Sequence, residues 1–221
     1  MFVSIFIQKI TLNRLIYVAK ISPSCMDHRN ITDHYEKLFY KMLKSHHGDT
    51  VSGLLLIYPS CVIHIIESSS QALYAILQDL AQLQNQDARS MLESSKVLVF
   101  SQKVPNRLFL QWYFRIINFP VVYLGSFIEE QAAASVLEDC LRLLLKLGVF
   151  LSQTLKLGSK GPGESLHDLA PQLLVREEVI RFLVTSDTLL TPEQFLAMYA
   201  RPLNSPGDSD QVWPIPQHLH L

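Results

Sequence analysis

The order of strand and helix signals in the first half of the chain restricts the fold more than any other feature of the sequence. Runs rich in β-branched and aliphatic residues alternate with stretches whose apolar residues recur every three or four positions. The predicted elements are, in chain order, strand 14–20, helix 33–43, strands 51–58 and 61–67, a helix around 73–80, and strands 96–101 and 111–117. This β-α-β-β-α-β-β order predicts a split βαβ, or ferredoxin-like, α+β fold with one added strand.

Local signals place the ends of the two helices. Asp33 stands three residues before Glu36, which predicts a capping pair at the start of the first helix, and the helix is expected to end near residues 45–48. The serines at 68–70 offer an N-cap for the second helix. Pro59 and Ser60 join two apolar runs, as in a hairpin of buried strands.

The first strand carries apolar side chains on both faces, because Leu15 and Tyr17 alternate with Ile16 and Val18. Such a sheet needs cover on both sides, whereas the two predicted helices of a ferredoxin-like unit pack on only one. We therefore expect the two helices on one face and C-terminal helices covering the other.

The second half contains the residues for this cover. A long helix with a wide apolar face is predicted from about Glu129 to Leu155, and the glycines at 158–163 indicate a flexible connector. A further helical segment is expected at 169–184. Thr191 and Gln194 then form a capping box, with Pro192 at the first helical position, for a short helix to about residue 200.

These signals divide the chain into three parts. Residues 12–120 are expected to form the ferredoxin-like domain, and residues 121–200 a helical extension. The Pro- and Ser-rich tail 201–221 is expected to be disordered.

Charge and hydropathy exclude several classes of partner. The chain has 19 Lys and Arg against 20 Asp and Glu, a net charge of −1, so it lacks the basic field that holds nucleic acid. An RNA-recognition motif has a similar topology but needs a basic, aromatic signature on its third strand, and 61–67 lacks it. The longest uncharged run, 51–66, contains Pro59 and His64 and is too short to span a bilayer, and residues 1–7 do not read as a secretory signal. Three widely spaced cysteines suit reduced thiols in a cytoplasmic protein.

The chain has no Gly-x-Ser-x-Gly, no Walker-type Gly-Lys-Ser/Thr and no His-Glu-x-x-His sequence, so we expect no enzymatic activity. Cys61 and His64, with His46 and His47 nearby, suggest a metal site, but a spacing of three in a strand sends two side chains to opposite faces. We therefore expect no metal.

The first half resembles the BLUF domain, the blue-light sensor that uses FAD. The residues that carry this resemblance are 14–20, 52–58, 62–67 before a helix, and 111–114, and together they cover close to half of the chain. The helical second half is similar to that of an animal, testis-expressed branch of BLUF-like proteins. This resemblance implies a cytoplasmic protein of sperm, in a flagellar assembly.

The resemblance also implies positions for a flavin site between the two helices and the sheet. Tyr17 stands at the position of the electron- and proton-donating tyrosine, and Trp112 at the tryptophan near the last strand. His64 replaces the glutamine that switches its hydrogen bonds, and His46 replaces the asparagine that holds the flavin ring. An imidazole cannot reproduce the paired donor and acceptor of a carboxamide, so the light switch is expected to be lost.

Two functions are consistent with these features of the sequence. The first is a light-insensitive, non-enzymatic BLUF-like module that holds no cofactor and acts by docking to protein partners, with self-association of the chain as one form of docking. The alternative is a sensor that still binds FAD, or a smaller ligand, beside Tyr17.

Overall fold

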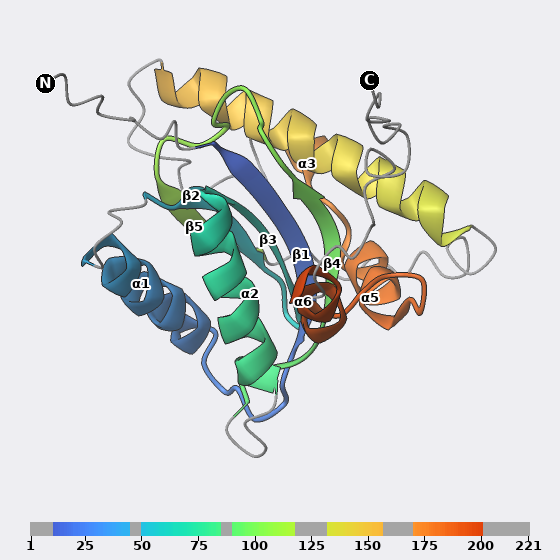
Figure 1. The fold of residues 1–221 in the computed structure, drawn as a ribbon. Helices are drawn as coiled ribbons and strands as arrows, with labels where there is room; N and C mark the ends of the chain where they lie inside the picture. Colours follow the sequence, from blue (N-terminus) through green and yellow to red (C-terminus); the bar gives the residue numbers. More distant parts are fainter. Residues whose placement is uncertain (1–10, 45–49, 85–89, 118–131, 157–169, 201–221) are drawn as a thin grey trace, which may run out of the picture.

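The computed structural model describes residues 11–44, 50–84, 90–117, 132–156 and 170–200 (Figure 1). Its five strands are β1 (Asn13–Ile21), β2 (Ser52–Ile57), β3 (Cys61–Ser68), β4 (Leu92–Ser101) and β5 (Trp112–Ile116). They form one sheet in the order β4-β1-β3-β2-β5. The predicted strands are confirmed, although β4 begins four residues before the expected position.

The strand pairing is that of a split βαβ unit. β1 and β2 both run antiparallel to β3, so they are parallel to each other with β3 inserted between them. β4 pairs antiparallel with β1, and β5 adds a parallel edge strand beside β2. The predicted ferredoxin-like sheet with one extra strand is thereby confirmed.

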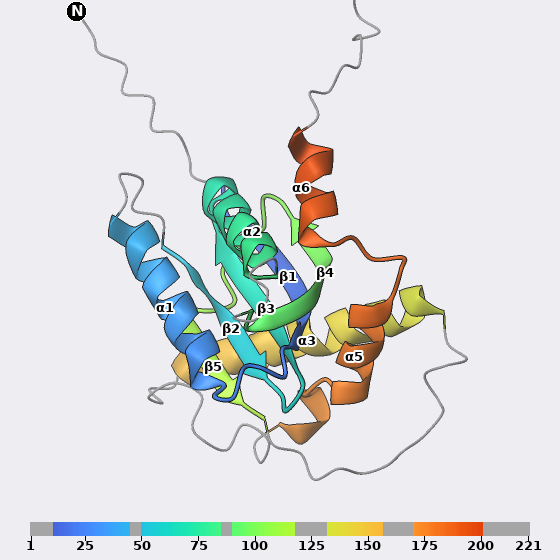
Figure 2. The same ribbon diagram turned by 90° about the horizontal axis from the view of Figure 1, so that it is seen from below.

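Helices cover both faces of the sheet. The helices are α1 (Arg29–Lys44), α2 (Ser70–Gln84), α3 (Ala133–Lys156), the 3-10 turn η2 (Pro171–Leu173), α5 (Glu177–Thr185) and α6 (Pro192–Ala200). α1 and α2 lie on one face and α3 crosses the other, as the edge-on view shows (Figure 2). Within the described ranges, no helix is both long and apolar enough to cross a membrane.

Each face of the sheet has its own hydrophobic core. On the α1 and α2 side, Leu15 and Tyr17 of β1 pack against Leu73 and Leu77 of α2. On the other side the core combines alternate β-strand residues with the inner faces of α3 and α5, namely Ile16, Val18, Val136, Cys140, Leu144, Leu147, Ile180 and Leu183. A fully buried aliphatic side chain contributes about 1.5–3 kcal/mol, so the second half stabilises the sheet directly.

Two predicted helix boundaries were wrong. α1 begins at Arg29, where the Asp27 carboxylate accepts a hydrogen bond from the Arg29 amide at 2.8 Å, so Asp33 and Glu36 lie inside the helix and do not cap it. The helix begins earlier because Ile31 is also buried against the sheet. The segment expected as one helix at 169–184 is divided into η2 and α5, because the chain is extended at Leu174.

The last helix departs from the predicted arrangement. α3 and α5 cover the second face as expected, but α6 packs against α2 and β4 on the first face. The reason is that Leu190 pairs with Val97 at the outer edge of β4 and so leads the chain around the sheet. The predicted capping box is confirmed, since the Thr191 amide donates to Gln194 Oε1 at 2.9 Å and the Gln194 amide donates to Thr191 Oγ1 at 3.3 Å.

Several predicted features lie outside the described residues. These are His46, the pair Glu129–Glu130, the glycine connector at 158–163 and the tail 201–221.

Candidate functional site

His64 lies in the middle of β3 with its ring on the α1 face, fully buried. It stands directly opposite Tyr17 on β1. Its Nδ1 is 2.8 Å from Tyr17 Oη, and its Nε2 accepts a hydrogen bond from Trp112 Nε1 at 2.8 Å. Tyr17 Oη is in turn 2.5 Å from the Oη of Tyr35, which comes from α1. Four side chains from four elements therefore form one buried polar network.

The tryptophan determines the protonation of the histidine. An indole N–H only donates, so His64 Nε2 must be unprotonated and the ring proton of the neutral imidazole lies on Nδ1. His64 Nδ1–H then donates to Tyr17 Oη. Burial lowers the pKa of His64 to about 3, which agrees with a neutral ring at physiological pH.

Aromatic rings surround this network. Tyr35 and Phe39, four residues apart on α1, project onto the same part of the sheet. The ring centroids of Tyr35 and His64 are 4.8 Å apart, and those of Phe39 and Trp112 are 5.3 Å apart. Burial raises the pKa of the Tyr17 and Tyr35 hydroxyls, so both stay protonated.

The structure brings together three of the four residues predicted for the site. Tyr17, His64 and Trp112 are in contact, whereas His46 lies outside the described residues. Tyr35 and Phe39 were not among the predicted site residues, although their spacing of four on an amphipathic helix is visible in the sequence. Cys61 belongs to the core on the opposite face, as predicted, and the described part of the chain contains no cluster of three metal-ligating side chains.

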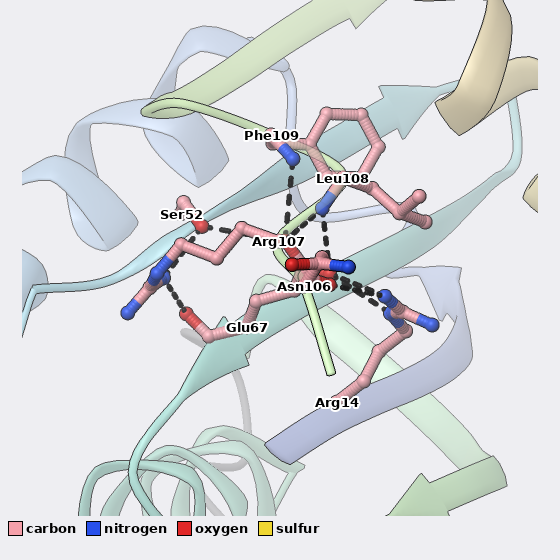
Figure 3. A network of polar contacts seen from close by, with 7 residues as sticks. All are labelled: Arg14, Ser52, Glu67, Asn106, Arg107, Leu108 and Phe109. Atoms are coloured by element: carbon pink, nitrogen blue, oxygen red, sulfur yellow. Dashed lines mark hydrogen bonds and ion pairs between the residues drawn. The ribbon is translucent and has the colours of Figure 1, made fainter. Parts of the chain in front are cut away.

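A second polar centre lies on the opposite face of β3, three residues further along. The Glu67 carboxylate is completely buried between Arg14 of β1 and Ser52 of β2, its neighbours across the sheet. It accepts hydrogen bonds from Arg14 Nε at 2.9 Å and Nη2 at 2.7 Å, and from the backbone amides of Leu108 and Phe109 at 2.9 and 3.2 Å (Figure 3).

Arg107 reinforces the same contact. Its Nη1 donates to Ser52 Oγ at 2.7 Å and to the Glu67 carbonyl at 2.9 Å (Figure 3). Its Nη2 donates to the Thr50 carbonyl at 3.0 Å. The network attaches the connection between β4 and β5 to the centre of the sheet. Because Trp112 follows this connection, Glu67 positions the strand that carries the tryptophan to His64. Sequence reasoning did not identify this role, although a carboxylate at the end of an apolar run was a visible signal.

The comparison of the sequence with protein families gives a match over most of the chain. The family model of testis-expressed protein 47 matches residues 11–201. The chain belongs to the testis-expressed protein 47 family. The match includes every described helix and strand, so the region shared with the family contains the five-stranded sheet together with α3, α5 and α6.

Similar solved structures include several BLUF proteins. Klebsiella pneumoniae BlrP1 with FMN and cyclic diGMP is 18% identical over 59% of this chain, with a TM-score of 0.35, and the aligned part is 30% of that chain. The BLUF protein BlrB in its dark state is 17% identical over 74% of this chain and 98% of that chain, with a TM-score of 0.34. The photo-activated state of BlsA is 12% identical over 78% of this chain and 91% of that chain, with a TM-score of 0.38. The family member described here thus spans less than a third of the BlrP1 chain.

Proposed function

We propose that the chain is a non-enzymatic interaction module in which the flavin-binding face of a BLUF-like sheet is closed by the protein's own aromatic side chains. The observation that supports this most directly is the network of Tyr17, Tyr35, His64 and Trp112. These side chains contact one another in the space between α1 and the sheet, where the BLUF resemblance would position a flavin.

The residues present do not fit a flavin. Flavin recognition requires polar side-chain atoms that are free to bond the ring edge. Both nitrogens of His64 are already bonded, to Tyr17 and to Trp112, and the imidazole has no exposed surface. A planar ring system would have to displace Tyr35 or Phe39 and leave buried polar atoms unpaired, at about 1–3 kcal/mol each.

The protonation states of the buried groups support a role without catalysis. Burial raises the pKa of the Cys61 and Cys140 thiols to about 12, which keeps both as unreactive thiols at neutral pH. His64 has the opposite shift and cannot accept a proton near pH 7. These shifts are those of groups fixed in a core, and a general base would need a pKa near the working pH.

The proposed setting is a cytoplasmic assembly of sperm, in the flagellum, with protein partners. The description of the family, a testis-expressed protein, supports expression in testis. Affinity purification from testis, with cross-link mapping, tests this setting. Cross-links between this chain and axonemal proteins would support it, whereas recovery of the chain with nuclear or secreted proteins alone would contradict it.

Flavin binding is tested with the purified full chain. We expect a colourless protein that does not retain added FAD on gel filtration, while a BLUF photoreceptor treated in the same way keeps its yellow flavin. A flavin absorption band that co-purifies with this chain and shifts after blue light would refute the proposal and establish the sensor function.

A further inference from the structure

β5 is the least buried strand of the sheet and forms one of its two edges. Every residue of the neighbouring strand β2 is buried, whereas each residue of β5 is half-buried or exposed. The opposite edge strand, β4, is paired at Val97 with Leu190, just before α6. Among the described residues, β5 pairs with β2 alone. The sheet therefore has an open edge at β5, and an open edge is a template for the addition of another strand.

The pairing with β2 determines which backbone groups of β5 point to the open edge. The Gln111 carbonyl accepts a hydrogen bond from the Gly53 amide at 3.2 Å, and the Ile117 amide donates to the Ile57 carbonyl at 2.7 Å. Successive residues of a strand direct their amide and carbonyl groups to alternate edges. The groups that point away from β2 are therefore the amides and carbonyls of Trp112, Phe114 and Ile116.

Exposed apolar side chains lie along the same side of the molecule. Leu110, two residues before β5, is 74% exposed, and Ile116 is 43% exposed. α1 lies over this side of the sheet (Figure 2). His34 of α1 faces α2 through its 2.7 Å bond to Asp79, and Leu43, about two and a half turns later, lies on the opposite side of the helix and is 52% exposed. Burial of these side chains against another chain would favour association.

The residues of β5 are complementary to a second copy of the same strand. When two β5 strands pair antiparallel about a two-fold axis at Phe114, Trp112 lies opposite Ile116 of the second copy. Each outward amide then meets an outward carbonyl. Trp112 and Phe114 lie on the α1 face, so an aromatic pair at the axis is flanked by two aromatic and aliphatic pairs. Such cross-strand pairs stabilise antiparallel sheets.

The charged residue of β5 is compatible with this register. Tyr113 lies on the other face of the sheet and would stand opposite Arg115 of the second copy, so the two arginines do not face each other directly. Arg115 Nη1 donates to the Phe114 carbonyl at 2.5 Å. A carbonyl oxygen has two lone pairs, so it can also accept the amide of the second copy.

We propose that two copies of the chain associate through antiparallel pairing of their β5 strands, which joins the two sheets into one continuous sheet. The proposal rests on the proposed interaction function and names a partner for it, a second copy of this chain. An identical strand is the occupant because a single two-fold axis matches the outward backbone groups and the side chains on both faces.

Sedimentation velocity of the purified full chain, over a wide range of concentrations, tests the association. We expect a reversible equilibrium between one and two copies. Ile116→Pro removes one outward amide from each copy and no bond to β2, and proline is tolerated on an edge strand where its nitrogen faces outward. This substitution should raise the dissociation constant of the dimer at least about tenfold.

Two charge variants complete this measurement. Ile116→Lys places a charge opposite Trp112 of the second copy and should also weaken the dimer, and it replaces Ile116→Pro if circular dichroism shows that the proline variant is misfolded. Met198→Lys is the matched control, because it introduces the same charge at an exposed position of α6, which packs beside β4 at the other edge of the sheet. The control should dimerise like the unmodified chain.

A cysteine at the two-fold axis tests the register. In a Cys25→Ser background, Phe114→Cys should form a disulfide between two copies, because opposite residues of a hydrogen-bonded antiparallel pair lie about 5.5 Å apart, within disulfide reach. Met198→Cys in the same background should not cross-link.

Several results would overturn the proposal. These are a chain that stays monomeric at every concentration, a dimer that neither substitution of Ile116 weakens, a dimer in which Phe114→Cys forms no cross-link, and a β5 edge that cross-links only to a different protein. Each of these results leaves the recovery of protein partners from testis unaffected, so failure of the β5 dimer is distinguishable from failure of the interaction function.

Discussion

Replacing Glu67 by glutamine is the sharpest test of how the two polar centres are related. The substitution keeps the shape of the side chain and removes its charge. One carboxylate oxygen accepts from Arg14 through two nitrogens, and the other accepts from the amides of Leu108 and Phe109. In either orientation, the NH₂ group of a glutamine would face at least two hydrogen-bond donors.

The magnitude follows from these contacts. Hydrogen bonds to a charged group contribute about 1.5–3 kcal/mol each, and removing one partner of a buried ion pair costs about 3–5 kcal/mol. Glu67 has no exposed surface and Arg14 only 13%, so water cannot replace the lost acceptor. We therefore expect Glu67→Gln to lower the free energy of unfolding by about 3–5 kcal/mol, a large part of the roughly 5–15 kcal/mol typical of a domain.

Urea unfolding followed by circular dichroism and tryptophan fluorescence measures this loss. Glu93→Gln is the matched control, because Glu93 forms an exposed ion pair with Lys20 at 2.6 Å, and such pairs contribute about 0–1 kcal/mol. The fluorescence of Trp112 should also change in Glu67→Gln, since the network positions the start of β5. Equal free energies of unfolding for the two variants would show that Glu67 does not hold the sheet together.

Three other predictions concern the core. The pKa of His64 is about 3 in the folded state and near 6.5 in the unfolded state. The free energy of unfolding should therefore keep its full value above pH 6.5 and fall by up to about 1.4 kcal/mol per pH unit as the pH drops below that value. Urea titrations of His64→Gln should lack this pH-dependent component. Gly53→Ala should cost more than about 3 kcal/mol or prevent folding, since a Cβ there would lie 2.1 Å from a backbone oxygen of β3. Gly148→Ala should be tolerated in thermal melts, because the nearest atom to a Cβ there, at 2.9 Å, is Cδ1 of Leu108 at the end of a flexible side chain, and the ring of Phe109 follows at 3.4 Å. Tyr58→Phe should lower the free energy of unfolding by about 1 kcal/mol through loss of the 2.7 Å bond to the Val175 carbonyl, and an unchanged urea midpoint would contradict that role.

Structural features that depend on residues close together in the sequence were predictable. The alternation in β1 and the helical spacing in α2 depend on the side-chain period of each element, which is written directly in the sequence. The capping box at Thr191 was predicted for the same reason, because donor and acceptor are only three residues apart. Asp33 carried an equally good local signal, but burial of Ile31 extended the helix past it.

The functional face was only partly predictable. The resemblance identified Tyr17, His64 and Trp112 as members of one site, and they are in contact. It did not indicate that both ring nitrogens of His64 would be hydrogen-bonded. The bond to Trp112 depends on the distance between β3 and β5, which are separated by β2 in the sheet. Tyr35 entered the network because the position of α1 over the sheet brings its hydroxyl to Tyr17.

The amino-acid sequence by itself determined the order of the elements, the two apolar faces of the sheet and the presence of histidines where the BLUF resemblance implies carboxamides, because each depends on residue type and short-range spacing. Only the tertiary structure decided that α6 crosses to the α2 face and that Glu67 accepts bonds from a connection about forty residues later in the chain. The physical reason is that a single hydrogen bond or aromatic contact between distant segments forms only after the sheet has brought their backbones together.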